Sequence, residues 1–197
     1  MKIKAILFDA GGVYLKGSFV NFVNKAYKVL DIRGKFKTSK EVTFDPDLNK
    51  GKVTIEKCFR DYFNIPISEY QMKKLIKLWN RTWVADKEMV KLVKLLKKNY
   101  ILAIFSNSDK SNDKIYKKKG WYDYFVYLIL SHEIGILKPD ERIYKFVLRK
   151  LKLKPQQCLL IDDQKDCLIT GEKIGMKTLL FKSSSKLKKD LKKMKII

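Results

Sequence analysis

The chain has 197 residues, of which 44 are Lys or Arg and 21 are Asp or Glu, so that its formal net charge is +23. Hydrophobic residues make up 46% of the chain, too many for a disordered polymer and enough for one domain with a modest insertion. No stretch approaches membrane-spanning length, and the apolar run at the N-terminus is too short for a signal peptide. We therefore expect a globular protein of the cytoplasm.

The positive charge raises the question of nucleic acid, because clustered Lys and Arg release counterions from a phosphate backbone. Residues 87–197 hold 27 Lys and Arg against 12 Asp and Glu, or +15. Most of these cations are lysines on the polar faces of predicted helices, as on an ordinary solvated surface. The charge therefore does not by itself predict a nucleic-acid partner, although it leaves one open.

Cysteine and histidine content narrows the possible metal sites. Cys58, Cys158 and Cys167 are odd in number and lack the paired short spacing of a zinc site, so they predict buried free thiols. His132 is the only histidine, which excludes a His-rich metal site and favours a structural or surface role. Any metal would therefore be bound mainly by oxygen atoms.

The chain begins with a predicted buried strand. Residues 3–8 form a short apolar run that ends in Asp9 and then Gly11-Gly12. This pattern places Asp9 at the C-terminal end of the strand, where the chain enters a tight loop.

A mostly helical block follows, without strong strand signals. Apolar residues cover a helical face over 18–30, residues 54–63 resemble a short helix, and a capping box at Ser68 begins a helix that runs through Trp79 towards Trp83. Between the helices, residues 45–47 and 49–51 are turn signals. Aromatic residues of this block could line a specificity pocket, but at helical spacing they favour a core: Phe19, Phe22, Tyr27, Phe59, Tyr62, Trp79 and Trp83.

After this block the signals alternate between helix and strand. This alternation predicts a parallel sheet with helices on both faces, whose ligands bind beyond the C-terminal strand ends. The predicted strands are 101–105, 125–130, 158–161 and 178–181, and the predicted helices are 85–96, 140–153, 168–174 and a docked terminal helix over 183–197.

Reactive side chains follow three of the predicted strands. Asp9 ends the first, Ser106 and Asn107 follow the second, and Asp162 and Asp163 come after the apolar run 158–161. In a parallel sheet these ends converge. Together with Lys138, they predict a carboxylate cluster, a hydroxyl and a cation around one crevice.

In their order and spacing these motifs resemble those of haloacid dehalogenase-like hydrolases. The resemblance covers nearly the whole chain: residues 8–13, 105–107, 135–140 and 161–163, with Gly175 and Met176 downstream. It implies an α/β fold, with a Rossmann-like parallel-sheet core formed by 1–14 and 87–197. It also implies a small helical cap inserted after the first strand, which coincides with the helical block at 15–86.

The resemblance also implies roles for individual residues. Asp9 would attack phosphorus to form an aspartyl-phosphate, and Mg²⁺ would be bound by Asp9, the Gly11 carbonyl and the acidic pair Asp162 and Asp163. Ser106 and Asn107 would hydrogen-bond the phosphoryl group as catalytic and substrate-binding residues. Lys138 would likewise be catalytic and substrate-binding: it would stabilise the negative charge of the transferred phosphoryl group and restrain Asp9.

Two positions depart from the family's pattern. Family phosphatases usually carry a second Asp two residues after the nucleophile, as general acid and base, and here that residue is Gly11. Cys167 stands where many relatives have Asn. No replacement acid or base can be identified from the sequence, although a residue of the cap could supply one.

We expect a Mg²⁺-dependent phosphatase of a small phosphorylated metabolite, such as a sugar phosphate. The alternatives are a 2-haloacid dehalogenase, which would use Asp9 to displace halide, and a weakly catalytic protein that binds an anion or nucleic acid. The sequence does not predict the substrate or the oligomeric state.

Overall fold

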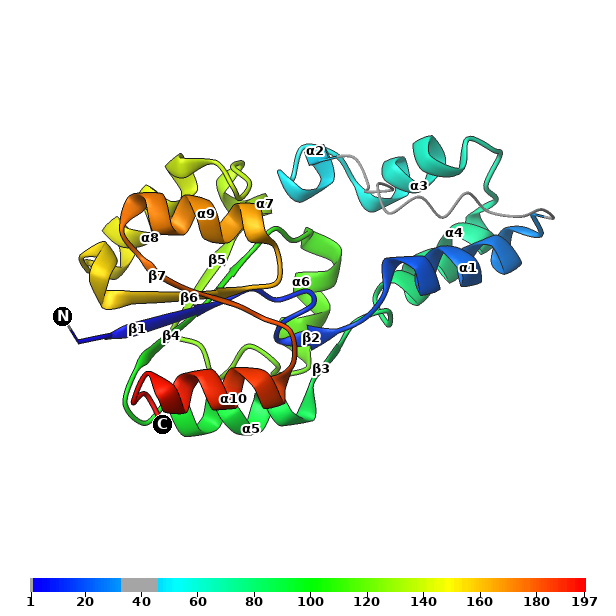
Figure 1. Ribbon diagram of the computed structural model, residues 1–197. Coiled ribbons are helices and arrows are strands. Elements are labelled where there is room, and N and C mark those ends of the chain that lie inside the picture. Colours follow the sequence, from blue (N-terminus) through cyan, green and yellow to red (C-terminus); the bar gives the residue numbers. More distant parts are fainter. Residues whose placement is uncertain (1, 33–45) are drawn as a thin grey trace.

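The structure is a computed structural model that describes residues 2–32 and 46–197. Its centre is a parallel sheet of five strands in the order β5-β4-β1-β6-β7, as Figure 1 shows. This arrangement confirms the predicted α/β fold class with a Rossmann-like parallel sheet. The strands are β1 (Ala5–Phe8), β4 (Ile101–Ser106), β5 (Tyr127–Leu130), β6 (Cys158–Asp162) and β7 (Lys177–Leu180).

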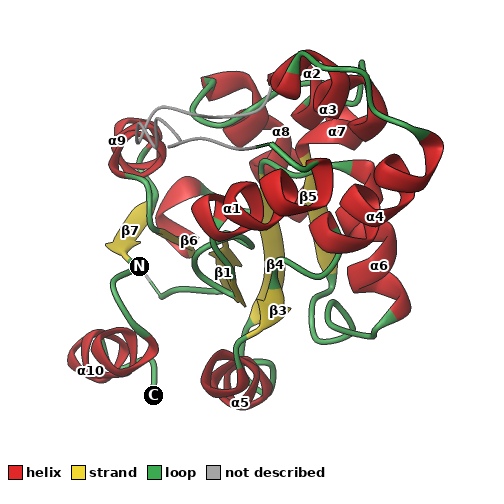
Figure 2. Cartoon of the chain, turned by 90° about the vertical axis from the view of Figure 1, so that its right-hand side faces the viewer, coloured by secondary structure: helices red, strands yellow, loops and turns green. Residues whose placement is uncertain are grey.

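Alternation along β1 divides its side chains between two hydrophobic layers. Ile6 and Phe8 belong to a cluster with α5 and α10, whereas Ala5 and Leu7 pack with α8 and α9 on the other face. Figure 2 shows α5 and α10 side by side, nearly end-on. The helices are α5 (Lys87–Leu96), α8 (Glu141–Leu151), α9 (Lys165–Ile174) and α10 (Ser184–Lys193).

The helical block contains α1 (Phe19–Leu30), α2 (Pro46–Asn49), α3 (Ile55–Phe63) and α4 (Glu69–Trp79). Ser18 and Thr54 cap α1 and α3 through their hydroxyl oxygens, and the capping box predicted at Ser68 is present. Phe22, Phe59 and Trp79 lie in a hydrophobic cluster built from residues of this block. The block thus has its own buried interior beside the sheet (Figure 1).

A two-stranded antiparallel ribbon joins the block to the sheet, and the sequence did not predict it. In this ribbon Leu15 of β2 (Leu15–Lys16) pairs with Ala85 of β3 (Val84–Ala85). Just beyond β2, Gly17 lies against Trp83, since a Cβ at Gly17 would come within 2.3 Å of the indole Cδ1. Glycine at this position allows the two connections to lie in contact.

Other differences from the sequence predictions are local. Pro46–Asn49 forms one helical turn instead of part of two turns, and α4 ends at Trp79, short of Trp83; Asp45 lies outside the described residues. α6 (Lys110–Lys118) and α7 (Ser131–Ile134) were not predicted. The buried positions of α6 are Asn112, Asp113 and Tyr116, so it lacks the apolar face by which a helix is recognised.

Cys58, Cys158 and Cys167 are buried and form no disulfide among the described residues, as predicted. None of the helices in the described ranges is long and apolar enough to cross a membrane.

Candidate functional site

The loop after β1 brings Asp9 to the C-terminal edge of the sheet. The Asp9 backbone N–H donates to the Ile161 carbonyl at 2.9 Å, which continues the pairing of β1 with β6. Gly12 then adopts a left-handed conformation with φ of 84°. A Cβ at Gly12 would lie 2.3 Å from Asp163 Oδ2, so glycine here lets the Asp163 carboxylate approach the loop.

Lys138 joins two of the predicted carboxylates in a buried ion cluster. Its Nζ lies 2.8 Å from Asp9 Oδ1 and 2.6 Å from Asp162 Oδ2. All three side chains are almost fully buried. Oxygen atoms of Asp9, Asp162 and Asp163 lie within 4.8 Å of one another. Asp9, Asp162 and Lys138 therefore interact with little water to screen them, while Asp163, the third carboxylate of the site, is exposed.

Burial and mutual repulsion alter the acidities in this cluster. Burial raises the pKa of Asp9 to about 6, with Lys138 opposing the rise and the Asp162 carboxylate adding to it. Burial, followed by repulsion from Asp162, likewise raises the pKa of Asp163. Burial acts to lower the pKa of Lys138, but the Asp9 and Asp162 carboxylates outweigh it and hold that pKa above its ordinary value. The lysine is therefore a permanent cation.

Asn107 fixes the backbone that carries Lys138. The Asn107 side-chain amide donates to the Lys138 carbonyl, and its side-chain oxygen accepts from the Lys138 N–H, each at 2.8 Å. Asp162 is fixed through Oδ1, which accepts from the Gln164 N–H at 2.8 Å. Asn107 thus positions a cation, a contact that the motif resemblance did not imply.

A cavity of about 170 Å³ lies against the loop that follows Asp9 and the C-terminal end of β4. Gly11, Ser106 and Asn107 line it from the sheet, and the Ser106 hydroxyl, at the end of β4, donates to the Asn107 carbonyl at 3.4 Å. Trp79 and Trp83 line it from the helical block. Both tryptophans therefore take the pocket position that sequence analysis considered the less favoured alternative, while Trp79 is also part of the block's core.

Asp109 is a lining residue that sequence reasoning missed. It caps α6, its two oxygens accept from the backbone and side-chain N–H groups of Asn112, and Oδ2 also accepts from Trp79 Nε1 at 3.2 Å. The last bond ties the helical block to the sheet domain. The polar residues before α6 could have indicated a helix N-terminus, but not its partner.

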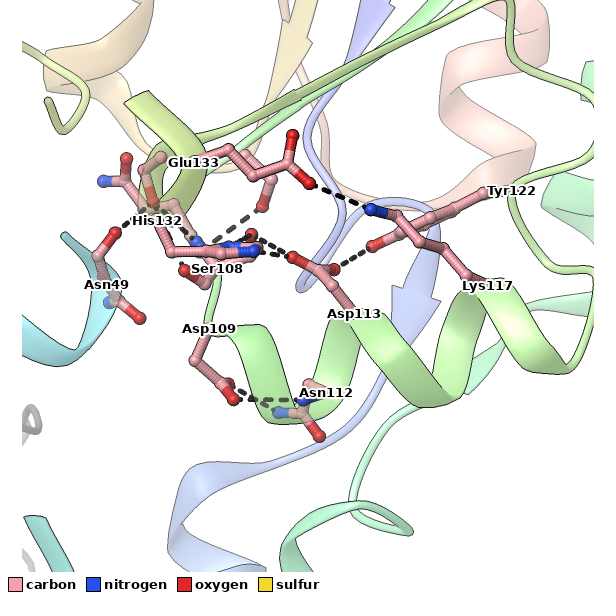
Figure 3. A network of polar contacts seen from close by, with 12 residues as sticks. Asn49, Ser108, Asp109, Asn112, Asp113, Lys117, Tyr122, His132 and Glu133 are labelled. Carbon is pink, nitrogen blue, oxygen red and sulfur yellow. Dashed lines mark hydrogen bonds and ion pairs between the residues drawn. The ribbon is translucent and has the colours of Figure 1, made fainter. Parts of the chain in front are cut away.

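A second polar cluster, which Figure 3 shows, gathers around the buried side chain of Asp113. Asp113 is at its centre: Ser108 Oγ donates to Oδ2 at 2.5 Å, and the Tyr122 hydroxyl donates to Oδ1 at 2.8 Å. His132 Nδ1 lies 3.3 Å from Oδ2. Burial raises the pKa of Asp113 to about 6, although these partners oppose the rise.

This second cluster also contacts the helical block. Ser131 donates to the Asn49 carbonyl of α2 at 2.6 Å and accepts from the Ser108 N–H at 3.0 Å. Gly51 lies so close to α7 that a Cβ there would come within 2.5 Å of the His132 carbonyl. An open cavity of about 750 Å³ adjoins these residues, between the helical block and α6.

Comparisons with known proteins identify the family. Residues 3–175 match the model of the haloacid dehalogenase-like hydrolases. Bifunctional epoxide hydrolase 2 of Rattus norvegicus is 33% identical over 104 residues, which are 50% of this chain and 19% of the rat protein, so the chain spans a small part of that relative. D-ribitol-5-phosphate phosphatase of Bacteroides thetaiotaomicron is 24% identical over 190 residues, 89% of this chain and 90% of that protein.

A solved structure shares the fold. It is a haloacid dehalogenase family enzyme of Bacteroides thetaiotaomicron in complex with magnesium and inorganic phosphate, with a TM-score of 0.76 and 23% identity over 91% of this chain and 94% of that one. The family match runs from the first strand through the helix that follows Asp163. The protein is therefore a hydrolase of the haloacid dehalogenase-like family.

Proposed function

We propose that the protein is a Mg²⁺-dependent phosphatase of a small phosphorylated metabolite. The observation that carries this proposal is the cluster of Asp9, Asp162 and Asp163, whose carboxylate oxygens lie within 4.8 Å of one another beside one buried lysine. One ammonium cannot neutralise three carboxylates, so the site favours a further cation and, with it, a phosphoryl group. Similarity to a D-ribitol-5-phosphate phosphatase supports the reaction class, release of phosphate from a small phosphorylated molecule, and not a particular leaving group.

Asp9 is the proposed nucleophile. One of its carboxylate oxygens forms a bond to phosphorus while the bond from phosphorus to the leaving oxygen breaks, which gives an aspartyl-phosphate. Water then attacks that phosphorus and releases inorganic phosphate, so one difficult displacement becomes two easier ones. Lys138 contacts Asp9 Oδ1 and so holds the carboxylate in one orientation.

Lys138, Ser106 and Asn107 form the proposed electrostatic frame for the transferred group. The ammonium of Lys138 is buried, and a buried cation interacts with phosphoryl charge more strongly than a solvated one does. Ser106 offers its hydroxyl from the end of β4, and Asn107 keeps Lys138 in place through two hydrogen bonds. These groups are fixed before the substrate arrives.

The residues fit a magnesium ion by the chemistry of their donor atoms. Asp9, Asp163 and the Gly11 carbonyl would bind it directly and Asp162 would lie beside them, a hard-oxygen set that leaves room for water and phosphate ligands. When bound, Mg²⁺ would neutralise charge on the phosphoryl oxygens and orient them. We further propose that the helical block at 15–86 serves as the cap over this site.

The test is phosphate release from an aryl phosphate and from sugar and nucleoside phosphates, with and without Mg²⁺. We expect turnover only with Mg²⁺ and its loss in Asp9→Asn. Calorimetric titration of Mg²⁺ gives a readout independent of activity, and Asp163→Ala is expected to weaken that binding about 10-fold or more.

Two results would contradict the proposal. Halide release from 2-haloacids without Mg²⁺ would assign dehalogenation instead. Absence of any turnover in folded, Mg²⁺-loaded protein, together with salt-sensitive binding of an oligonucleotide, would assign a binding role.

A further inference from the structure

The backbone conformation at Gly11 and the space around it would allow a larger residue, but the residue is glycine. Gly11 lies two residues after Asp9, and it is not among the glycines with positive φ. A Cβ at this position would meet a single atom within 4 Å, Trp83 Nε1 at 4.0 Å. The wall of the cavity closest to the nucleophile's loop is therefore an indole N–H from the helical block.

The position of Trp83 is well determined by its packing. Its Cδ1 edge lies on Gly17, and its ring meets the Trp79 ring edge-on with centroids 4.6 Å apart. Within the described residues no hydrogen-bond acceptor is paired with Trp83 Nε1. An uncharged donor thus lines the same cavity as Ser106.

Proton donors for a departing alkoxide are scarce around this cavity. Among the described residues, Asp109 supplies its one lining carboxyl, and three N–H groups already donate to that carboxyl's oxygens. The Tyr122 hydroxyl is engaged with Asp113. Burial and then nearby carboxylates raise the pKa of Tyr116 and of Tyr122, which makes both phenols weaker acids.

We propose that the enzyme acts on phosphates whose leaving group departs as a stable anion, with the indole N–H of Trp83 donating a hydrogen bond to the leaving oxygen. This inference rests on the proposed phosphatase function and names its substrate class: acyl, enol or aryl phosphates. Alkyl phosphates, which include most sugar phosphates, would be poor substrates.

The chemistry balances without a general acid in the first step. An oxygen of Asp9 bonds to phosphorus, the phosphorus–oxygen bond to the leaving group breaks, and its electron pair remains on the departing carboxylate, enolate or phenolate. In the second step water attacks phosphorus and Asp9 leaves as a carboxylate, while the proton from water passes to the phosphate product.

The experiment measures kcat/KM for acetyl phosphate, a series of substituted phenyl phosphates and an alkyl phosphate, all with Mg²⁺. This ratio reports steps up to departure of the leaving group, even when hydrolysis of the aspartyl-phosphate limits kcat. We expect kcat/KM to fall steeply with leaving-group pKa, by about 10³-fold or more from nitrophenyl to alkyl phosphate, because general acid help worth about 10² to 10⁴ is missing.

Gly11→Asp and its matched control Gly11→Asn separate proton donation from steric effects. Gly11→Asp is expected to raise kcat/KM for alkyl phosphates about 10²-fold and flatten the dependence on leaving-group pKa, whereas Gly11→Asn leaves it steep. Trp83→Phe keeps a ring but removes the N–H, and it should reduce kcat/KM most for the poorer leaving groups.

The outcomes separate the two proposals. Turnover with a flat dependence on leaving-group pKa, or equal behaviour of Gly11→Asp and Gly11→Asn, would overturn this inference and leave the phosphatase proposal standing. No phosphate release from any member of the series, acetyl phosphate included, would overturn both.

Discussion

Two polar clusters contact neighbouring residues after β4, the first through Asn107 and the second through Ser108, and they differ in how their carboxylates are satisfied. Around Asp9, three carboxylates share one ammonium. Around Asp113, one carboxylate receives two hydroxyl groups and faces a histidine ring. The first cluster has negative charge in excess, whereas in the second each carboxylate oxygen has a hydrogen-bond donor from within the protein.

A buried carboxylate with a raised pKa therefore does not by itself identify a catalytic site. The pKa of Asp9 and that of Asp113 are both raised to about 6, in each case first by burial. What separates the two clusters is the excess of carboxylates over partners within the protein. Carboxylates in excess of their partners favour binding of a cation, whereas a carboxylate whose oxygens are all hydrogen-bonded within the protein stabilises the fold.

The largest effect should come from Asp9→Asn, which removes the proposed nucleophile but keeps the shape of the side chain. We expect kcat/KM on an aryl phosphate to fall by a factor on the order of 10⁴ or more. The free energy of unfolding, measured by urea denaturation, should change little, since Lys138 keeps its contact with Asp162. If Asp9→Asn lost stability as well as activity, the Asp9 cluster would be structural in the same way as the Asp113 cluster.

Asp113→Ala should show the opposite pattern. It leaves the hydroxyls of Ser108 and Tyr122 without their acceptor in a buried site, so we expect a loss of about 2 to 4 kcal/mol of stability. The kcat/KM of the folded fraction on the same aryl phosphate should stay within about threefold of the unaltered protein. A drop in kcat/KM as large as that expected for Asp9→Asn would place Asp113 in the chemistry.

The pH dependence of stability should depend on the same residue. Because the pKa of Asp113 is raised from 3.8 to about 6, the folded state holds its proton while the unfolded state releases it. Stability therefore falls as pH rises from about 4 to about 6, by about 3 kcal/mol at most from this group. Denaturation of the native protein and of Asp113→Asn across this range should show a smaller fall in the variant, and equal slopes would contradict the assignment.

The smallest effect is expected from Ser131→Ala, at the contact between the second cluster and the helical block. The change removes the bond to the Asn49 carbonyl and leaves the Ser108 N–H without its acceptor, at a cost of about 1 to 2 kcal/mol. Limited proteolysis should cut residues 46–53 faster in the variant. An unchanged cleavage rate would mean that this contact does not hold α2 against α7.

The sequence predicted the sheet and the ends of its strands well, because each strand is a short apolar run followed by polar residues. Asp9, Lys138, Asp162 and Asp163 therefore meet where the motif order led us to expect them. β2 and β3 are two residues each, too short for any periodicity. The second cluster was unpredictable because the partners of Asp113 include Tyr122 and His132, which lie beyond the end of its own helix at no regular spacing.

The sequence also could not predict that Trp83 forms part of the cavity wall. Its contact with the Gly11 position depends on the close approach of Gly17, where the chain enters and leaves the helical block. The spacing of residues along the chain predicts neither the contact of Trp83 with Gly17 nor its position near Gly11. The sequence could name Trp83 as a candidate, but not the atom that it presents.

The ribbon of β2 and β3 has a consequence for the order of folding. β1 and β4 pair directly, although the whole helical block separates them along the chain, and closing so long a loop carries an entropic cost. A helical block that collapses first on its own apolar interior, with the ribbon closed at its base, shortens the loop to the residues between the ribbon and the two strands. A long-range parallel pairing, which is intrinsically slow, then becomes a nearly local one.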